Sequence, residues 1–420
     1  MVTILRTLPY LVLSPSSAAV FWLVVLLIAS QYRRLAASEE RAYGVSRMGA
    51  LEALASGVLY GILGGFVASV LLVFIGVSLS GSGIGYLLPL AFLLYLVSPR
   101  LMCYSYAGGL VSFSYLLFGF PKVNVSGIMT LVAVLHMAES ILIRVSGAGC
   151  STPVFVRNRK GEVVGGYSLQ RFWPVPLVVL LFVMVQDLSQ VDGLIQMPDW
   201  WPLVGGEEAR GVPNALFAMV PVVAALGYSD ISLTCSPQER VKKTSGLLAA
   251  YSLSLLLVSL ASTRHRPLEW LAALMGPLGH ELVVAVGIRR EMSGEPRFIP
   301  PGKGVMILDV LPGSPAAAAG LRRGDVITEV SGVPVNSRDE LNRAVEMTPV
   351  FLEVTVDRPG EDRERTVRFR GVVERLGIIT VPEEGDQPNV EIRHANYAWR
   401  FAKTLRRRLF GFLERWRRSR

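Results

Sequence analysis

Long apolar runs occupy the first 290 residues, and their lengths predict membrane-spanning helices. A helix needs roughly 17 to 25 mainly apolar residues to cross a bilayer. Nine stretches fit, at residues 10–30, 54–78, 84–99, 101–120, 123–143, 174–190, 214–231, 246–262 and 268–288. The last contains Gly276, Pro277 and Gly279, so it is expected either to cross or to re-enter on one side. We expect residues 1–290 to form a polytopic α-helical membrane bundle of about eight or nine spans.

From residue 297 the pattern changes to short alternating stretches separated by turns, which predicts a small α+β domain over residues 297–371. The expected elements are a strand at 304–311, an Ala-rich helix from Pro315 to Gly320, a strand at 325–330, a helix at 338–347 and a hairpin of 350–357 with 364–370. Ser337 and Glu340 have the spacing of a capping box, which supports a helix start near residue 338.

The last part of the chain predicts a linker and a basic amphipathic helix. Residues 372–392 are acidic and contain Gly and Pro, which is typical of a linker. Residues 393–420 hold ten Lys and Arg against one acid, and an apolar residue recurs every three or four positions. The residues expected to contact the membrane surface are Phe401, Arg406, Arg407, Arg408, Phe412 and Trp416. We expect this helix to lie on anionic lipid, and we expect no nucleic-acid partner.

The composition agrees with a membrane protein. Apolar residues make up 51% of the chain and charged residues only 18%, with a mean hydropathy of +0.44. Soluble proteins average about 25% charged residues. Arg33 and Arg34 follow the first apolar run, and no small-residue cleavage site follows it. This favours an uncleaved first span over a signal peptide.

The positions of lysine and arginine predict the orientation. With the N-terminus outside, 13 of the 18 Lys and Arg before Arg289 face inside, and the domain at 297–371 is cytoplasmic. Cys103, Cys150 and Cys235 then fall at the reducing inner face, and their spacing matches neither a disulfide framework nor a metal motif. If residues 268–288 do not cross, the domain lies outside instead.

Three glycines on one face of the second apolar run, Gly57, Gly61 and Gly65, have the double GxxxG spacing. Small residues at this spacing let helix backbones approach closely. Packing inside the same bundle is the favoured interpretation. A dimer face is the alternative, which leaves homo-oligomerisation open.

Four ionisable residues lie inside predicted spans: His136, Glu139, His280 and Glu281. His136 and Glu139 share a helix face, and both histidines are expected at nearly the same depth. Ionisable groups at that depth are costly, so they are paired or functional. A self-satisfying hydrogen-bonded pair is favoured over a proton or signal relay and over a metal site, for which His and carboxylate are suitable ligands. We expect no bound metal or other cofactor.

The sequence around His280 can be compared with the zinc-binding motif of intramembrane proteases. Intramembrane metalloproteases of the site-2 class need HExxH, in which two His at i and i+4 bind zinc and Glu is the base. Here Val284 stands in place of the second His, and no apolar span follows the small domain to supply a further ligand. No G-x-S-x-G motif occurs either. We expect no catalytic residues and no enzyme activity.

The small domain resembles a bacterial PDZ domain over about 75 residues. The matching stretches are GKGV, LPGSPAAAAGL, RRGDVITEVSGVPV and SRDELNRAV. PDZ domains bind an extended peptide by adding it as a strand. The resemblance implies a groove between the strand at 305–308 and the helix at 338–347, with the glycine-containing entry receiving a peptide carboxylate. The residues implied are Gly302, Lys303, Gly304, Val305, Met306, Ile307, Leu308, Arg338, Leu341 and Val345.

The layout of many spans followed by one terminal PDZ domain resembles the MinJ-like cell-division topological determinants of Gram-positive bacteria. This resemblance implies a plasma-membrane scaffold whose cytoplasmic PDZ domain recruits cytoplasmic or membrane protein partners, with a role in placing the division site. Two alternatives remain open. One is a sensor or transporter that uses the intramembrane His and Glu residues, and the other is a degenerate site-2-type metalloprotease.

Overall fold

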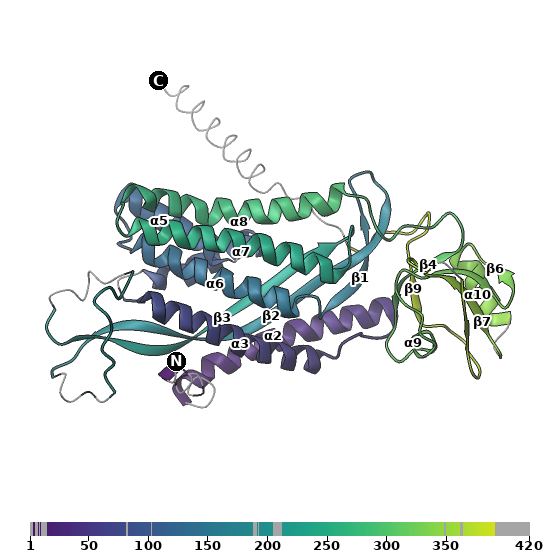
Figure 1. Ribbon diagram of the computed structural model, residues 1–420, viewed down its shortest axis with the longest axis horizontal. Helices are drawn as coiled ribbons and strands as arrows, with labels where there is room; N and C mark the ends of the chain where they lie inside the picture. Colours follow the sequence, from purple (N-terminus) through teal and green to yellow (C-terminus); the bar gives the residue numbers. More distant parts are fainter. Residues whose placement is uncertain are drawn as a thin grey trace, which may run out of the picture.

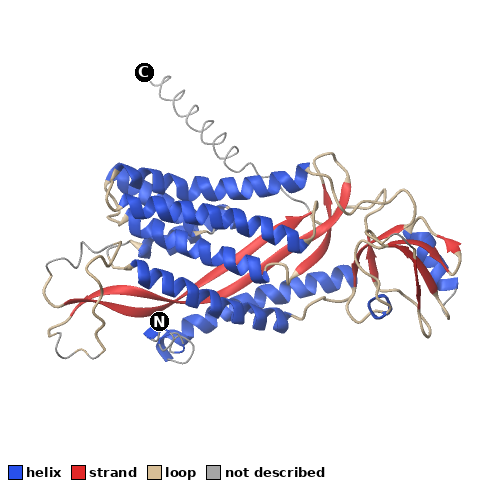
Figure 2. Cartoon of the chain, viewed as in Figure 1, coloured by secondary structure: helices blue, strands red, loops and turns tan. Residues whose placement is uncertain are grey.

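The computed structural model describes residues 15–390 apart from 81–82, 102, 188–190, 192, 205–211, 348–349 and 362–363, together with Thr3, Ile4, Thr7 and Pro9. An elongated region of helices and one long sheet is followed by a small mixed domain at one end (Figures 1 and 2). The expected basic helix at 393–420 lies outside the described residues, and so do its lipid-contacting residues.

Most of the predicted spans are helices. The bundle contains α2 (Pro15–Tyr43), α3 (Ala50–Ile75), α4 (Leu87–Val97), α5 (Tyr104–Phe118), α6 (Val125–Ser146), α7 (Pro237–Ser262) and α8 (Pro267–Ser293), with short 3-10 turns at Ile84–Tyr86 and Pro99–Leu101. Among the described residues, five of these helices are long and apolar enough to cross a membrane: α2 from Ala18, α3, α6, α7 and α8. Pro277 lies inside α8 without ending it.

The predicted third and fourth spans are shorter than expected. The helices α4 and α5 have 11 and 15 residues, fewer than the roughly 17 that a span needs. The junction between them lies against the middle of α6, because the Cys103 Sγ is 3.3 Å from the His136 Nε2. Arg100, at the same junction, forms an ion pair with Glu281 on α8 at 2.7 Å. The two helices therefore form a pair that enters the bundle and returns.

Two predicted spans, 174–190 and 214–231, are not helices. They belong to β2 (Val163–Met184) and β3 (Ala215–Ser232), which pair antiparallel, with β1 (Ser151–Arg157) on the other side of β2. An apolar run buried on both faces has no period that separates strand from helix. Pro174, Pro176 and Pro221 lie within these runs, and proline disfavours a helix interior.

β1 pairs with only the first part of β2, over residues 163–169. Along the rest of that edge, side chains of the helical region form hydrogen bonds with the β2 backbone. The hydroxyls of Tyr32, Ser69 and Ser80 accept the backbone N–H groups of Phe172, Val178 and Phe182 at 2.8–3.0 Å. Pro174 and Pro176 have no N–H to satisfy. A strand can lie among apolar helices only when its backbone groups have partners, and the N–H groups of Phe172, Val178 and Phe182 have them along this edge.

The glycine ladder of α3 packs on β2. A Cβ at Gly57, Gly61 or Gly65 would lie 2.8, 2.2 or 2.0 Å from the carbonyl oxygens of Phe172, Pro174 and Pro176, respectively. The glycines therefore allow α3 to lie directly on the strand backbone, inside the same bundle. Packing within the bundle was the expected use of this ladder, but the partner is a strand and not a helix.

The small domain contains β4 (Val305–Val310), α9 (Pro315–Ala318), β5 (Val326–Val330), β6 (Val333–Pro334), α10 (Arg338–Met347), β7 (Glu353–Asp357), β8 (Arg365–Arg368) and β9 (Ile378–Thr380). The elements through β8 follow the predicted order. Ser337 accepts the N–H of Glu340 at 3.2 Å and starts α10 as its spacing predicted. The sheet order is β8-β7-β5-β4-β9, with β6 beside β5.

The expected domain boundary at residue 371 is too early. Residues 372–392 were expected to form a linker, but Val373 and Leu376 are buried in the core of the small domain, and β9 pairs with β4. The segment is therefore part of the small domain, and β9 is the last strand on this side of its sheet.

A buried ion pair stabilises the small domain and gives a testable prediction. The Arg358 guanidinium donates two hydrogen bonds of 2.8 Å to Asp325, whose side chain is 1% exposed. Replacing Asp325 by alanine removes the buried carboxylate that Arg358 contacts most closely and leaves it, among the described residues, only the exposed Glu361 and the Gly320 carbonyl, so we expect a loss of about 3–5 kcal/mol in unfolding free energy by denaturant titration. The control is Glu353→Ala, which removes an exposed pair with Arg368 and should cost at most about 1 kcal/mol. Equal effects would contradict the prediction.

Candidate functional site: a free sheet edge and a buried Cys–His cluster

The predicted groove strand β4 has no free edge. It lies between β5 and β9, with Val305 opposite Ile327 and Ile307 opposite Thr380. A peptide cannot add beside a strand whose two edges are already paired. The prediction that a peptide lies against residues 305–308 is therefore wrong.

Gly304, directly before β4, is needed for the backbone conformation and not for binding a peptide carboxylate. Gly304 has φ +82°, and a Cβ there would lie 2.7 Å from the Ile327 carbonyl oxygen. Its N–H donates to Asn336 Oδ1 at 3.1 Å, so it is not available to a peptide carboxylate. Gly302 and Lys303 are exposed, whereas Val305, Ile307 and Leu308 are buried. Met306 is half-buried.

The free edge of the sheet belongs to β9. Gly377 accepts the N–H of Leu311, and the N–H of Val381 donates to Met306, so these residues point toward β4. Backbone groups alternate along a strand, which directs the N–H and C=O groups of Ile378 and Thr380 away from β4. Unpaired backbone groups on a sheet edge are a template for a further strand. This is the candidate peptide-binding edge.

Helix α10 borders this edge through Arg338. The Arg338 Nε donates to Thr380 Oγ1 at 2.8 Å, and the guanidinium forms an ion pair with Asp386 at 2.6 Å. Although burial acts to raise it, the pKa of Asp386 is lowered by hydrogen bonds from Arg338 and from the Glu383 N–H. The other two α10 residues expected at the groove, Leu341 and Val345, are 2% and 4% exposed and belong to the core.

The small domain is attached to the bundle by polar contacts around Asp309. This carboxylate forms ion pairs with Arg47 from the α2–α3 connection and with Arg323. Burial raises the pKa of Asp309, while the two guanidinium groups act in the opposite direction. The Tyr167 hydroxyl donates to the Leu308 carbonyl, and Phe298 packs on the Tyr167 ring with centroids 5.5 Å apart. The domain therefore has a defined position on the bundle.

His136 and His280, the two histidines expected at nearly the same depth, lie next to each other in the bundle. The rings of His136 on α6 and His280 on α8 have centroids 5.2 Å apart. The sequence did not indicate a third member: Cys103, at the start of α5, has its Sγ 3.3 Å from His136 Nε2 and 3.9 Å from His280 Nε2. Glu139 lies 4.0 Å from His136, while Glu281 bonds to Arg100 and Tyr106.

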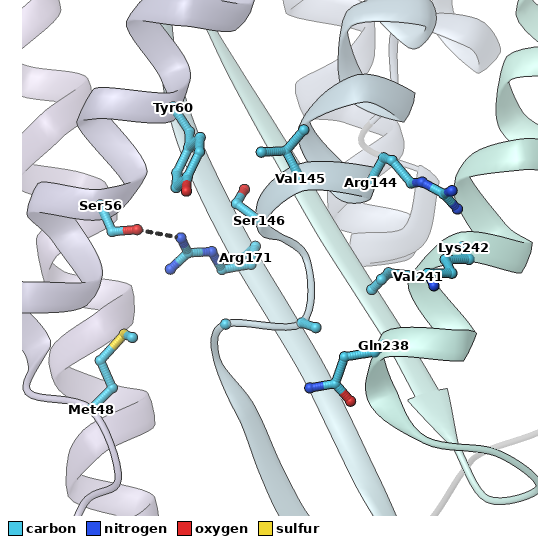
Figure 3. Close-up of a pocket in the computed structure, with 12 residues that line it drawn as sticks. Met48, Ser56, Tyr60, Arg144, Val145, Ser146, Arg171, Gln238, Val241 and Lys242 are labelled. Carbon is cyan, nitrogen blue, oxygen red and sulfur yellow. Dashed lines mark hydrogen bonds between the residues drawn. The ribbon is translucent and has the colours of Figure 1, made fainter.

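A third feature is a pocket of about 290 Å³ between α3, β2 and α7 (Figure 3). Its lining includes three cationic side chains, Arg144, Arg171 and Lys242. Arg171 is 1% exposed and donates to Ser56 Oγ at 2.7 Å and to Cys150 Sγ at 3.0 Å. In the described part of the chain, no carboxylate forms an ion pair with it within 4.0 Å.

Comparison with known proteins identifies the small domain. Residues 306–356 match the family model of the PDZ domain, and they include parts or all of β4, α9, β5, β6, α10 and β7. The chain therefore contains a PDZ domain. A 68-residue stretch is also 41% identical to the putative serine protease HhoA of Synechocystis sp., covering 16% of this chain and 17% of that protein.

The wider similarity is to proteins of cell division. The cell division topological determinant MinJ of Bacillus subtilis is 23% identical over 243 residues, which is 57% of this chain and 57% of that protein. The probable cell division topological determinant MinJ of Lacticaseibacillus paracasei is 25% identical over 276 residues, covering 62% of this chain and 67% of that protein. The chain is thus homologous to MinJ determinants over about 60% of its length, and the alignment spans little more than half of the Bacillus protein.

Proposed function

We propose that this protein is a multi-span membrane adaptor of cell division that recruits protein partners through its PDZ domain. The observation that supports recruitment most directly is the free edge of β9, where Ile378 and Thr380 present unpaired backbone groups. The similarity to MinJ determinants supports the connection with cell division. The partner peptide adds as a strand beside β9, with α10 and Arg338 on the neighbouring side.

The PDZ domain lies on the cytoplasmic side in this proposal. The β1–β2 turn, at the PDZ end of the bundle (Figure 1), is flanked by Arg157 and contains Arg159 and Lys160. The segment 185–214 between β2 and β3, at the opposite end, has only Arg210 as a basic residue but holds five acids. An excess of Lys and Arg is typical of the cytoplasmic side. The five long helices, an odd number, leave the N-terminus outside.

The adaptor acts without chemistry of its own in this proposal. His280 and Glu281 lack the second histidine of HExxH, since residue 284 is valine. The Glu281 carboxylate is engaged by Arg100 and Tyr106 at 2.7 Å each. The sensor or transporter alternative retains one supporting observation, which is the meeting of His136 and His280 inside the bundle.

Deleting residues 297–390 tests the proposed function. We expect the shortened protein to stay in the membrane fraction but to lose the partners that cross-link to the full chain, because the free edge is gone. The measurement is cross-linking followed by mass spectrometry on both proteins, expressed at equal levels. An unchanged partner set for the shortened protein would refute recruitment through the PDZ domain.

A further inference from the structure

Three side chains that bind transition metals converge between α5, α6 and α8. The sulfur of Cys103 and ring nitrogens of His136 and His280 all lie within 4.8 Å of one another. We propose that these three residues bind a divalent metal ion of the zinc type, which joins the three helices inside the bundle. This site is independent of the PDZ domain and of the adaptor role.

The spacing of the ligand atoms fits a tetrahedral ion. With a zinc–sulfur distance of about 2.3 Å and a zinc–nitrogen distance of about 2.0–2.1 Å, tetrahedral angles place sulfur and nitrogen about 3.6 Å apart. The Cys103 Sγ is 3.3 Å from His136 Nε2 and 3.9 Å from His280 Nε2. Both distances lie within a few tenths of an ångström of that separation. The two histidine nitrogens lie within 4.8 Å of each other, and binding the ion brings them to about 3.3 Å.

Hydrogen bonds at the far side of each ring orient the histidines as ligands. The His136 Nδ1 lies 2.8 Å from the Val132 carbonyl oxygen, which can only accept, so Nδ1 has the proton. Tyr106 donates its hydroxyl proton to Glu281 at 2.7 Å, and its oxygen lies 3.3 Å from the His280 Nδ1. Both Nε2 lone pairs therefore point at the same sulfur. Such second-layer bonds are typical of metal-binding histidines.

The Nε2 atoms of His136 and His280 are both hydrogen-bond acceptors, and the Cys103 thiol is their shared neighbour. A cysteine thiol has one proton and can donate it to one nitrogen only. A metal ion satisfies both nitrogens and the sulfur together, and the thiol releases its proton to solvent on binding. Three protein ligands leave one tetrahedral position for water, and the Glu139 carboxylate lies 4.0 Å from His136 Nε2 on the same helix.

The donor set selects the kind of ion. Thiolate and imidazole suit zinc and related transition metals, whereas magnesium and calcium prefer oxygen ligands. Hydrogen bonds behind His280 hold the site in place. Tyr106 donates to Glu281, and Glu281 forms an ion pair of 2.7 Å with Arg100. His136, Tyr251 and His280 pack edge to face, with His136 and Tyr251 centroids 5.7 Å apart.

Cobalt titration of the full-length protein tests this site. The protein is purified in detergent without a histidine tag, treated with a chelator, and titrated with Co²⁺. We expect tetrahedral cobalt absorption with a thiolate charge-transfer band, saturating at one equivalent and displaced by Zn²⁺. Cys103→Ser should abolish the charge-transfer band. Tyr106→Phe removes the hydroxyl behind His280 and should weaken cobalt binding about 10- to 100-fold.

Matched controls use the same residue types elsewhere in the chain. Cys235→Ser and His265→Gln lie outside the cluster and should bind cobalt as the unmodified protein does. A folded, unmodified protein that gives no cobalt band and no zinc-dependent rise in unfolding temperature would overturn the proposal. A charge-transfer band that persists in Cys103→Ser but disappears in Cys235→Ser would overturn it as well. The cluster would then be a hydrogen-bonded thiol–imidazole group only.

Discussion

Replacing Gly61 by leucine is expected to prevent the bundle from folding stably. A Cβ at this position would lie 2.2 Å from the Pro174 carbonyl oxygen and 3.0 Å from its carbon, and both are backbone atoms that cannot rotate away. Relief requires α3 to move off β2, which would also break the Ser69 bond to the Val178 N–H. Overpacking costs typically 1–3 kcal/mol and more where backbone must move, so we expect at least about 3 kcal/mol. Thermal unfolding in detergent measures this loss of stability.

The control for this prediction is another helical glycine. Gly246 on α7 is exposed, and a Cβ there would meet nothing within 4 Å. Gly246→Leu should therefore leave the unfolding temperature unchanged or raise it, because leucine has the higher helix propensity. If Gly61→Leu and Gly246→Leu unfold at the same temperature, α3 does not pack on β2 as described.

Replacing Thr380 by proline is expected to abolish partner binding while the PDZ domain stays folded. The Thr380 N–H points away from β4, so proline leaves the β4–β9 ladder intact. The ring removes the donor that an added strand needs and fills part of its space. We expect peptide affinity to fall at least tenfold, about 1.4 kcal/mol. Calorimetry with a peptide selected by display against the unmodified protein measures the loss.

Two variants separate this effect from unfolding. Thr380→Val keeps the N–H and the side-chain shape but removes the hydroxyl that accepts from Arg338, so it should bind the peptide nearly normally. Proline at Ile379 acts on the opposite side of the strand and should destabilise the domain, because that residue faces β4. Normal peptide affinity in Thr380→Pro would show that the ligand does not add beside β9.

The helices and the order of most PDZ elements could be predicted because their patterns are local. The apolar lengths of α3 and α6 and the cap at Ser337 are properties of neighbouring residues. The strands β2 and β3 are different. The apolar run of β2 is buried on both faces over residues 173–180, which is compatible with either structure, and β3 alternates between buried and exposed residues only at 224–229. The prolines at positions 174 and 176 are the local feature that disfavours helices.

The two candidate sites were harder to predict because they depend on contacts between distant residues. The strand β9 has only three residues, in a segment whose glycine, proline and acids are typical of a linker. It is defined by its pairing with β4, which is distant in the sequence. Cys103 lies 33 residues from His136 and 177 from His280, so no local spacing connects them. The equal depth of His136 and His280 in their predicted spans suggested that the two could lie close together. It gave no indication that the Cys103 sulfur lies beside them.

Hydrogen–deuterium exchange on the full-length protein, with and without the selected peptide, shows which strand the peptide joins. We expect the amides of Ile378 and Thr380 to gain protection when the peptide binds, because they become donors to the added strand. The amides of β4, already paired on both sides, should keep their exchange rates. Protection that appears along residues 305–308, with none at Ile378 and Thr380, would show that the peptide does not bind beside β9.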